Sequence, residues 1–157
     1  MIETILTAVR SITNPRFYKT ERGFQGELDG LLSASLRDKE PRDAIVEQEA
    51  QKTLKLHGIR RRPDIIIHCP TQEGGDRRIG NYAVILLKRR GDENAARKDF
   101  LALDEIIDAL DYPIGTFINI DSPRTYSALY RGRFRERLHF VAVHLSQDGV
   151  VLAHDHP

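Results

Sequence analysis

Hydrophobic positions along the 157-residue chain recur at helical spacing in three stretches. The first stripe runs over residues 2–12, and the pair Asn14 and Pro15 ends it. A second stripe covers about residues 24–36, and a third, longer one covers residues 96–110. Polar residues fill the positions between the stripes, so each stretch predicts a helix with one buried face.

Other stretches are continuously apolar or rich in β-branched residues, which favours strands. The clearest are the runs "PDIIIH", "YAVILLK" and "IGTFINI". Residues 43–56 fit a helix or a strand, and the β-branched run that follows favours a strand paired with "PDIIIH". The C-terminal runs "LHFVAVHL" and "VLAHDH" flank Asp148 and Gly149, a sequence typical of a hairpin turn.

One further helix is expected after residue 121, because Ser122 and Pro123 form a typical helix start. The order of elements is then helix, helix, strand, strand, strand, helix, strand, helix, hairpin. This order predicts an α/β fold with a central mixed sheet flanked by helices. The length suits a single domain over residues 1–157.

The composition changes this picture little. Apolar residues make up 40% and charged residues 30%, which is typical of a globular protein. No run approaches the ~20 apolar residues that cross a bilayer, and the N-terminus lacks the pattern of a secretory signal. The single Cys69 excludes an intramolecular disulfide. We therefore expect a cytoplasmic protein without membrane contact.

Charge is informative by its distribution, since the net charge is only +1. Basic residues cluster at 60–62, 77–78 and 88–90, next to the predicted strands. Such an edge suits a phosphate backbone and favours nucleic acid as a partner. The alternative is that these charges solvate strand ends and discourage edge pairing.

The segments "RRPDIIIH" and "AVILLKRR", followed by a helix and "YPIGTFINID", resemble the PD-(D/E)XK nuclease superfamily over about residues 24–121. The resemblance implies a restriction-endonuclease-like fold and hydrolysis of DNA phosphodiester bonds with Mg²⁺. It assigns catalytic roles to Asp64 and Lys88, with Glu27 as an assisting acid from the first core helix. The motif acid two residues before Lys88 is missing, because Leu86 stands there.

Strand alternation places Leu86 and Lys88 on one face, and a leucine cannot bind a metal. Mg²⁺ is usually held by one or two carboxylates with waters and substrate phosphates, so a relocated acid could complete the site. Glu49, or less favourably Glu47, lies on the strand expected to pair with Asp64. The predicted metal ligands are therefore Asp64 and Glu49.

The arginines predicted to contact nucleic acid are Arg61, Arg62, Arg89 and Arg90. Sequence-specific reading would have to come from loops, a partner or a second subunit, since no separate DNA-binding motif accompanies the core. A homodimer is thus one expected form. A zinc site among the six histidines is disfavoured, because His68 is expected as a strand-end residue and His154 and His156 belong to a chain terminus, where fraying is normal.

Two functions remain open at this stage. The first is Mg²⁺-dependent DNA hydrolysis at an atypical or weakened site. The second is a nuclease fold without catalysis that acts as a scaffold for nucleic acid or protein. Leu86 favours the scaffold, whereas the retained Asp64, Lys88 and Glu27 favour the enzyme, because buried charges without a function cost desolvation energy.

Overall fold

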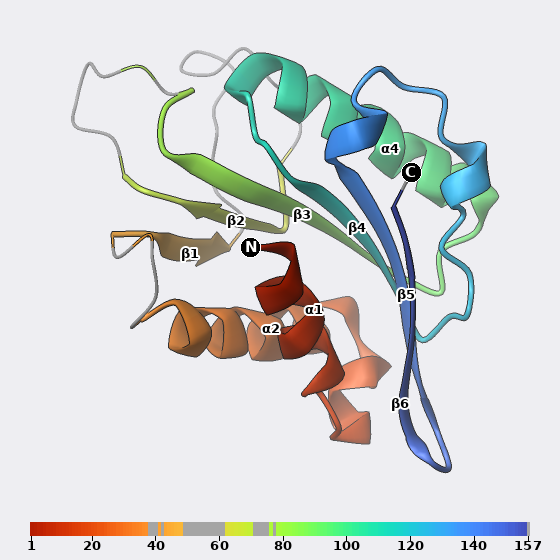
Figure 1. The fold of residues 1–157 in the computed structure, drawn as a ribbon. Helices are drawn as coiled ribbons and strands as arrows, with labels where there is room; N and C mark the ends of the chain where they lie inside the picture. Colours follow the sequence, from red (N-terminus) through yellow and green to blue (C-terminus); the bar gives the residue numbers. More distant parts are fainter. Residues whose placement is uncertain (38–40, 42, 49–61, 71–75, 77, 157) are drawn as a thin grey trace.

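A computed structural model of the chain describes residues 1–37, 41, 43–48, 62–70, 76 and 78–156. Its centre is a six-stranded mixed sheet in which the strands lie side by side in chain order, β1 to β6 (Figure 1). The strands are β1 (Ile45–Gln48), β2 (Ile65–His68), β3 (Asn81–Arg89), β4 (Gly115–Ile120), β5 (Leu138–Ser146) and β6 (Gly149–Asp155). The predicted α/β class with a mixed sheet is confirmed.

The direction of the strands changes across the sheet. The first three strands form an antiparallel meander, in which Ile65 of β2 lies opposite Ile85 of β3. Helix α4 (Glu93–Leu110) connects β3 to β4, which lie parallel. The segment between β4 and β5 brings β5 parallel to β4, and β6 returns antiparallel to β5. The predicted pairing of the first strand with the "PDIIIH" strand and the C-terminal hairpin are both present.

Helices α1 (Ile2–Arg10) and α2 (Glu21–Leu36) cover one face of the sheet, and α4 (Glu93–Leu110) covers the other (Figure 1). The core under α1 and α2 includes Phe24 and Leu28 with the odd-numbered residues of β2 and β3. The core under α4 contains their even-numbered residues, including Leu86. Strand alternation therefore builds two apolar layers on one sheet.

The prediction of a helix after residue 121 is wrong. Only short 3₁₀ turns occur there, at Ser127–Leu129 and Arg135–Arg137. The Ser122 hydroxyl accepts bonds from the Asn119 side chain and the Arg124 N–H, at 3.0 and 3.2 Å, so it stabilises a turn. Tyr126 then takes a left-handed conformation (φ 58°), which a continuing helix does not allow.

Ends of several elements meet where the candidate site lies. Residue 64 precedes β2, and because β2 is antiparallel to β3, this start lies beside the end of β3. Helix α2 reaches the same place with its first turn, as its hydrogen bonds to residues 64 and 89 show.

No helix in the described ranges is long and apolar enough to cross a membrane.

Candidate active site

Asp64 is fixed at the start of β2 by bonds to two other elements. Its Oδ2 atom accepts the backbone N–H of Leu87 at 2.7 Å, across the β2–β3 pair. Its backbone carbonyl accepts a bond from Gln25 Nε2 of α2, also at 2.7 Å. Pro63 before it is buried. The carboxylate is therefore held in one orientation against the end of β3.

Lys88 lies one residue beyond the amide that binds Asp64. Its Nζ atom is 3.6 Å from Glu21 Oε1, and both side chains are about one-third exposed, at 33% and 37%. Gly91 packs against the lysine stem, since a Cβ at position 91 would lie 2.7 Å from Lys88 Cγ. The ammonium group is thus placed at the strand end and remains accessible to solvent.

Helix α2 connects both strands through residues one turn apart. Thr20 caps the helix by accepting the Gly23 N–H at 3.0 Å, which places Glu21 in the first turn. Residues four apart share a helix face, so Glu21 and Gln25 point to the same side. Glu21 Oε2 also accepts the N–H of Arg89 at 3.0 Å. One helical turn therefore joins the start of β2 to the end of β3.

The electrostatics of the site converge on the carboxyl group of Asp64. Burial raises its pKa to about 6 from the usual 3.8, although the Leu87 N–H lowers it. The negative charges of Glu21 and Asp99 raise the pKa further, and the positive charge of Lys88 opposes them. A carboxylate whose pKa is raised by burial and by like charges is typical of functional sites.

The glutamate predicted from the helix is not the one that reaches this group. Glu27 lies six residues after Glu21, about 9 Å farther along the helix axis. The charged groups that shift the pKa of Asp64 are Glu21, Lys88 and Asp99, and Glu27 is not among them. The structure therefore brings Asp64 and Lys88 together, with Glu21 in the place expected for Glu27.

The proposed replacement acids have different positions. Glu49 lies outside the described residues. Glu47 is in β1 opposite Ile66, and its Oε2 atom is 3.0 Å from Nε2 of His68. Leu86 is 5% exposed and packs in the core under α4, so an acid in its place would have to be buried.

Asp64 and Glu49 are the predicted metal ligands, and of these two only Asp64 is among the described residues. Among the described residues, no group of three or more His, Cys, Asp or Glu side chains could hold a metal ion. Mg²⁺ commonly uses one or two protein carboxylates and completes its shell with water and phosphate oxygens. Asp64 fits that role, since a cation would favour the ionised form of a carboxyl whose pKa is raised by burial and, to a smaller extent, by the charges of Glu21 and Asp99.

The predicted DNA-binding arginines are placed as follows. Arg62 is exposed, and Arg61 lies outside the described residues. Arg89 donates to the Tyr18 carbonyl at 2.7 Å and pairs with Asp121 at 3.2 Å. Arg90 pairs with the same Asp121 at 2.7 Å. Arg89 therefore connects β3 to neighbouring segments. Arg90 has 65% of its side chain exposed, so its guanidinium group remains accessible to a phosphate.

The sequence reasoning missed Glu21, Gln25 and Asp99. The signal for the first two was present, because Glu21, Gln25, Leu28 and Leu32 recur at helical spacing on one face. The helix was expected to begin near residue 24, which left Glu21 outside it. Recognising Thr20 as an N-cap would have moved the start to the correct residue.

Comparison with known proteins adds no relative to this description. No protein-family profile matches the chain, and no match was found among curated proteins or among solved structures. The functional assignment therefore depends on the geometry of the Asp64 site.

Proposed function

We propose that this protein is a metal-dependent phosphodiesterase that hydrolyses DNA, built on a restriction-endonuclease-like fold. The observation that carries the proposal is a partly buried carboxylate of raised pKa, Asp64, beside the ammonium group of Lys88 at adjacent strand ends. The order helix α2, strands β1 to β3, helix α4 and strand β4 agrees with the arrangement that the nuclease resemblance implies.

In this proposal, Asp64 would hold Mg²⁺ together with water and substrate oxygens. When bound, Mg²⁺ supplies Lewis-acid polarisation of the phosphate and lowers the pKa of a coordinated water. The Leu87 N–H keeps the Asp64 carboxylate oriented, at 2.7 Å from Oδ2. Glu21 positions the Lys88 ammonium through the 3.6 Å ion pair.

The reaction is hydrolysis of one ester bond. A water oxygen forms a bond to phosphorus, one P–O ester bond breaks, and the leaving oxygen takes up a proton. Lys88 stabilises the negative charge that develops on the phosphoryl oxygens, which is the largest contribution that a fixed cation can make. Arg62 and Arg90 are exposed and could contact flanking phosphates.

A nuclease fold without catalysis, which binds nucleic acid or protein, is the second candidate. The observation in its favour is Leu86, which packs into the apolar layer under α4 where the motif acid is expected. The two candidates differ in whether Asp64 and Lys88 are needed for turnover.

Cleavage of plasmid and single-stranded DNA with Mg²⁺ or Mn²⁺ tests the proposal. We expect Asp64→Asn and Lys88→Ala to lose activity by about a hundredfold or more, the usual effect of removing a group that stabilises the transition state. Glu27→Gln, purified in the same way, serves as the control and should cleave like the wild type. Equal cleavage by all variants would indicate a contaminant, and no cleavage by the wild type would favour the scaffold.

A further inference from the structure

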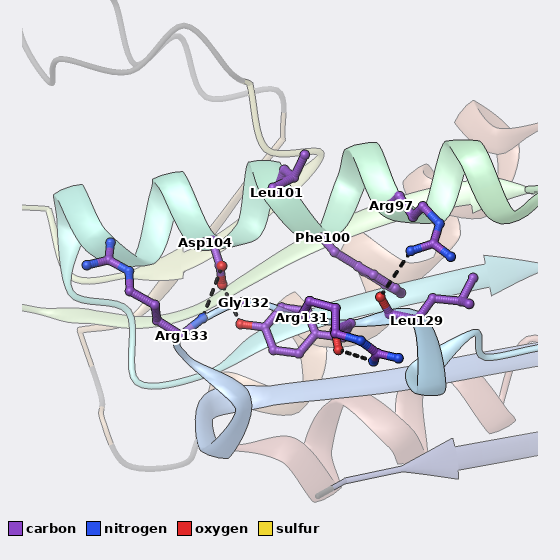
Figure 2. A pocket seen from close by; sticks show the side chains of 9 residues that line it. Arg97, Phe100, Leu101, Asp104, Leu129, Arg131, Gly132 and Arg133 are labelled. Atoms are coloured by element: carbon purple, nitrogen blue, oxygen red, sulfur yellow. Dashed lines mark hydrogen bonds between the residues drawn. The ribbon is translucent and has the colours of Figure 1, made fainter.

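A cavity of about 430 Å³ lies on the side of α4 that faces the segment before β5 (Figure 2). Arg97, Phe100, Leu101 and Asp104 line it from α4, and Leu129, Tyr130, Arg131, Gly132 and Arg133 line it from the opposite segment. Asp99, the α4 residue that acts on Asp64, is about 200° around the helix from Arg97. The cavity is therefore separate from the candidate active site, and its size is in the range of small-molecule pockets.

The cavity is built with fixed walls. Asp104 accepts the Tyr130 hydroxyl and, at 3.3 Å, the N–H of Arg133, so the carboxylate that lines it is engaged internally. Gly132 is required at this point, because a Cβ there would collide with Asp104 and with the Tyr130 hydroxyl. The neighbouring Phe100 and Tyr130 rings pack edge to face, with centroids 5.9 Å apart.

The guanidinium groups at the cavity are not equally neutralised. Arg133 pairs with Asp108 at 3.0 Å. Arg131 donates through Nη1 to two backbone carbonyls, and Arg97 donates to the Leu129 carbonyl at 3.5 Å. In the described part of the chain, neither Arg97 nor Arg131 forms an ion pair with a carboxylate. Two cations held by carbonyls thus border an apolar cavity and retain donors for an anion.

We propose that this cavity binds a nucleoside monophosphate, with the phosphate on Arg97 and Arg131 and the base against the apolar wall at Leu101 and Leu129. Charge complementarity supports the phosphate, because the planar arginine fork matches phosphate oxygens. The apolar wall supports a planar organic body, since a base packs well between apolar side chains. The occupant is either a free nucleotide or the terminal nucleotide of a strand, which share this chemistry.

Titration calorimetry with dAMP, deoxyadenosine and inorganic phosphate tests the proposal. We expect dAMP to bind at least about tenfold more tightly than either of the other two, because each lacks half of the recognised chemistry. An oligonucleotide with a terminal phosphate, tested against free dAMP, distinguishes the two sources. Binding of deoxyadenosine or of phosphate as tight as that of dAMP would overturn the proposal, as would no binding of dAMP.

A pair of variants at one exposed position localises the binding. Leu101 is 61% exposed, so Leu101→Glu and Leu101→Lys should both keep the wild-type melting temperature. We expect Leu101→Glu to weaken dAMP binding about tenfold and Leu101→Lys to weaken it less, because both remove an apolar contact with the base but only the glutamate also repels the phosphate. Arg131→Gln should weaken dAMP binding by a factor similar to that of Leu101→Glu.

Identical dAMP affinities in wild type, Leu101→Glu and Arg131→Gln would place the nucleotide elsewhere and overturn the proposal. Asp64→Asn should bind dAMP like the wild type, because neither Asp64 nor Lys88 lines the cavity. Loss of DNA cleavage and loss of nucleotide binding can therefore be distinguished.

Discussion

At the scale of single residues, the side chain of Asp64 lies in an environment that disfavours its charged form. Its carboxylate is partly buried, and two neighbouring carboxylates, Glu21 and Asp99, oppose its ionisation. Among the described residues, the amide of Leu87 and the nearby Lys88 favour the charged form. Such an arrangement is expected where function rather than stability selects a residue.

Asp64→Asn should therefore stabilise the protein in the absence of metal. The folded-state pKa of Asp64, about 6, is above its ordinary value of 3.8, so this group's contribution is fully present below pH 3.8 and is lost as pH rises through 6. Asparagine does not ionise and can still accept the Leu87 N–H.

Thermal melts in EDTA at pH 8 and at pH 4.5 measure this effect. We expect Asp64→Asn to raise the free energy of unfolding by about 2 kcal/mol at pH 8 and by much less at pH 4.5. The exposed Asp43→Asn is the control and should change nothing at either pH. A destabilised Asp64→Asn at pH 8 would show that the carboxylate is structural.

The sequence could predict Asp64 and Lys88 but not their partners. The two residues belong to strands with clear β-branched or apolar runs, and the pairing of such strands follows from their adjacency. Glu21 and Gln25 depend on the register of a helix start, which shifts with a single cap residue, Thr20. Helix boundaries carry less signal than helix existence, so the sequence pointed to Glu27, and Glu21, six residues earlier, was not considered.

At the scale of elements, the hairpin of β5 and β6 contains a stack of imidazole rings. His139 Nδ1 lies 3.0 Å from His154 Nε2, and the rings of His139 and His156 stack with centroids 4.2 Å apart. Burial lowers the pKa of His139 to about 4, and the two neighbouring histidines add to this effect. His154 also faces Glu3 and Arg10 of α1, whose charges act on its pKa in opposite directions.

This stack predicts a loss of stability in mild acid. Because the folded-state pKa of His139 is below its ordinary 6.5, the neutral ring contributes fully above pH 6.5, and the contribution is lost as pH falls toward 4. In denaturant melts, the free energy of unfolding should fall between pH 7.5 and 4.5 by on the order of 2 kcal/mol more in the wild type than in His139→Gln. The opposite effect of Asp64 over this range is common to both proteins and cancels in the comparison. His144→Gln, on the same strand, is the control. An unchanged pH profile in His139→Gln would exclude the stack as the cause.

The helix predicted after β4 is absent because side-chain hydrogen bonds stabilise a turn there. The segment after β4 has the Ser-Pro start of a helix, yet Ser122 binds Asn119 and Arg124 and directs the chain into a turn. Tyr130 is then buried against Phe100 and Phe140 in the α4 layer. Tertiary packing of an aromatic residue therefore overrode the local helix signal, which no periodicity in the sequence reveals.

At the scale of the whole molecule, helices pack on both faces of one mixed sheet. The candidate active site lies where the strand ends meet, and a separate cavity lies between α4 and the segment before β5. Helix α2 joins β2 and β3 through Glu21 and Gln25. Helix α4 separates the Asp64 site from the cavity at Arg97 and Arg131. The candidate active site and the cavity therefore lie apart in the fold.

We claim that the Asp64 site binds a divalent cation. A Mn²⁺ titration followed by electron paramagnetic resonance measures this binding. Glu21 and Glu27 lie on the same helix and allow the same substitution, so they form a matched pair. We predict that the wild type and Glu27→Gln bind Mn²⁺ alike, that Glu21→Gln binds it more weakly, and that Asp64→Asn loses binding. Equal Mn²⁺ binding by Asp64→Asn and the wild type would contradict the claim.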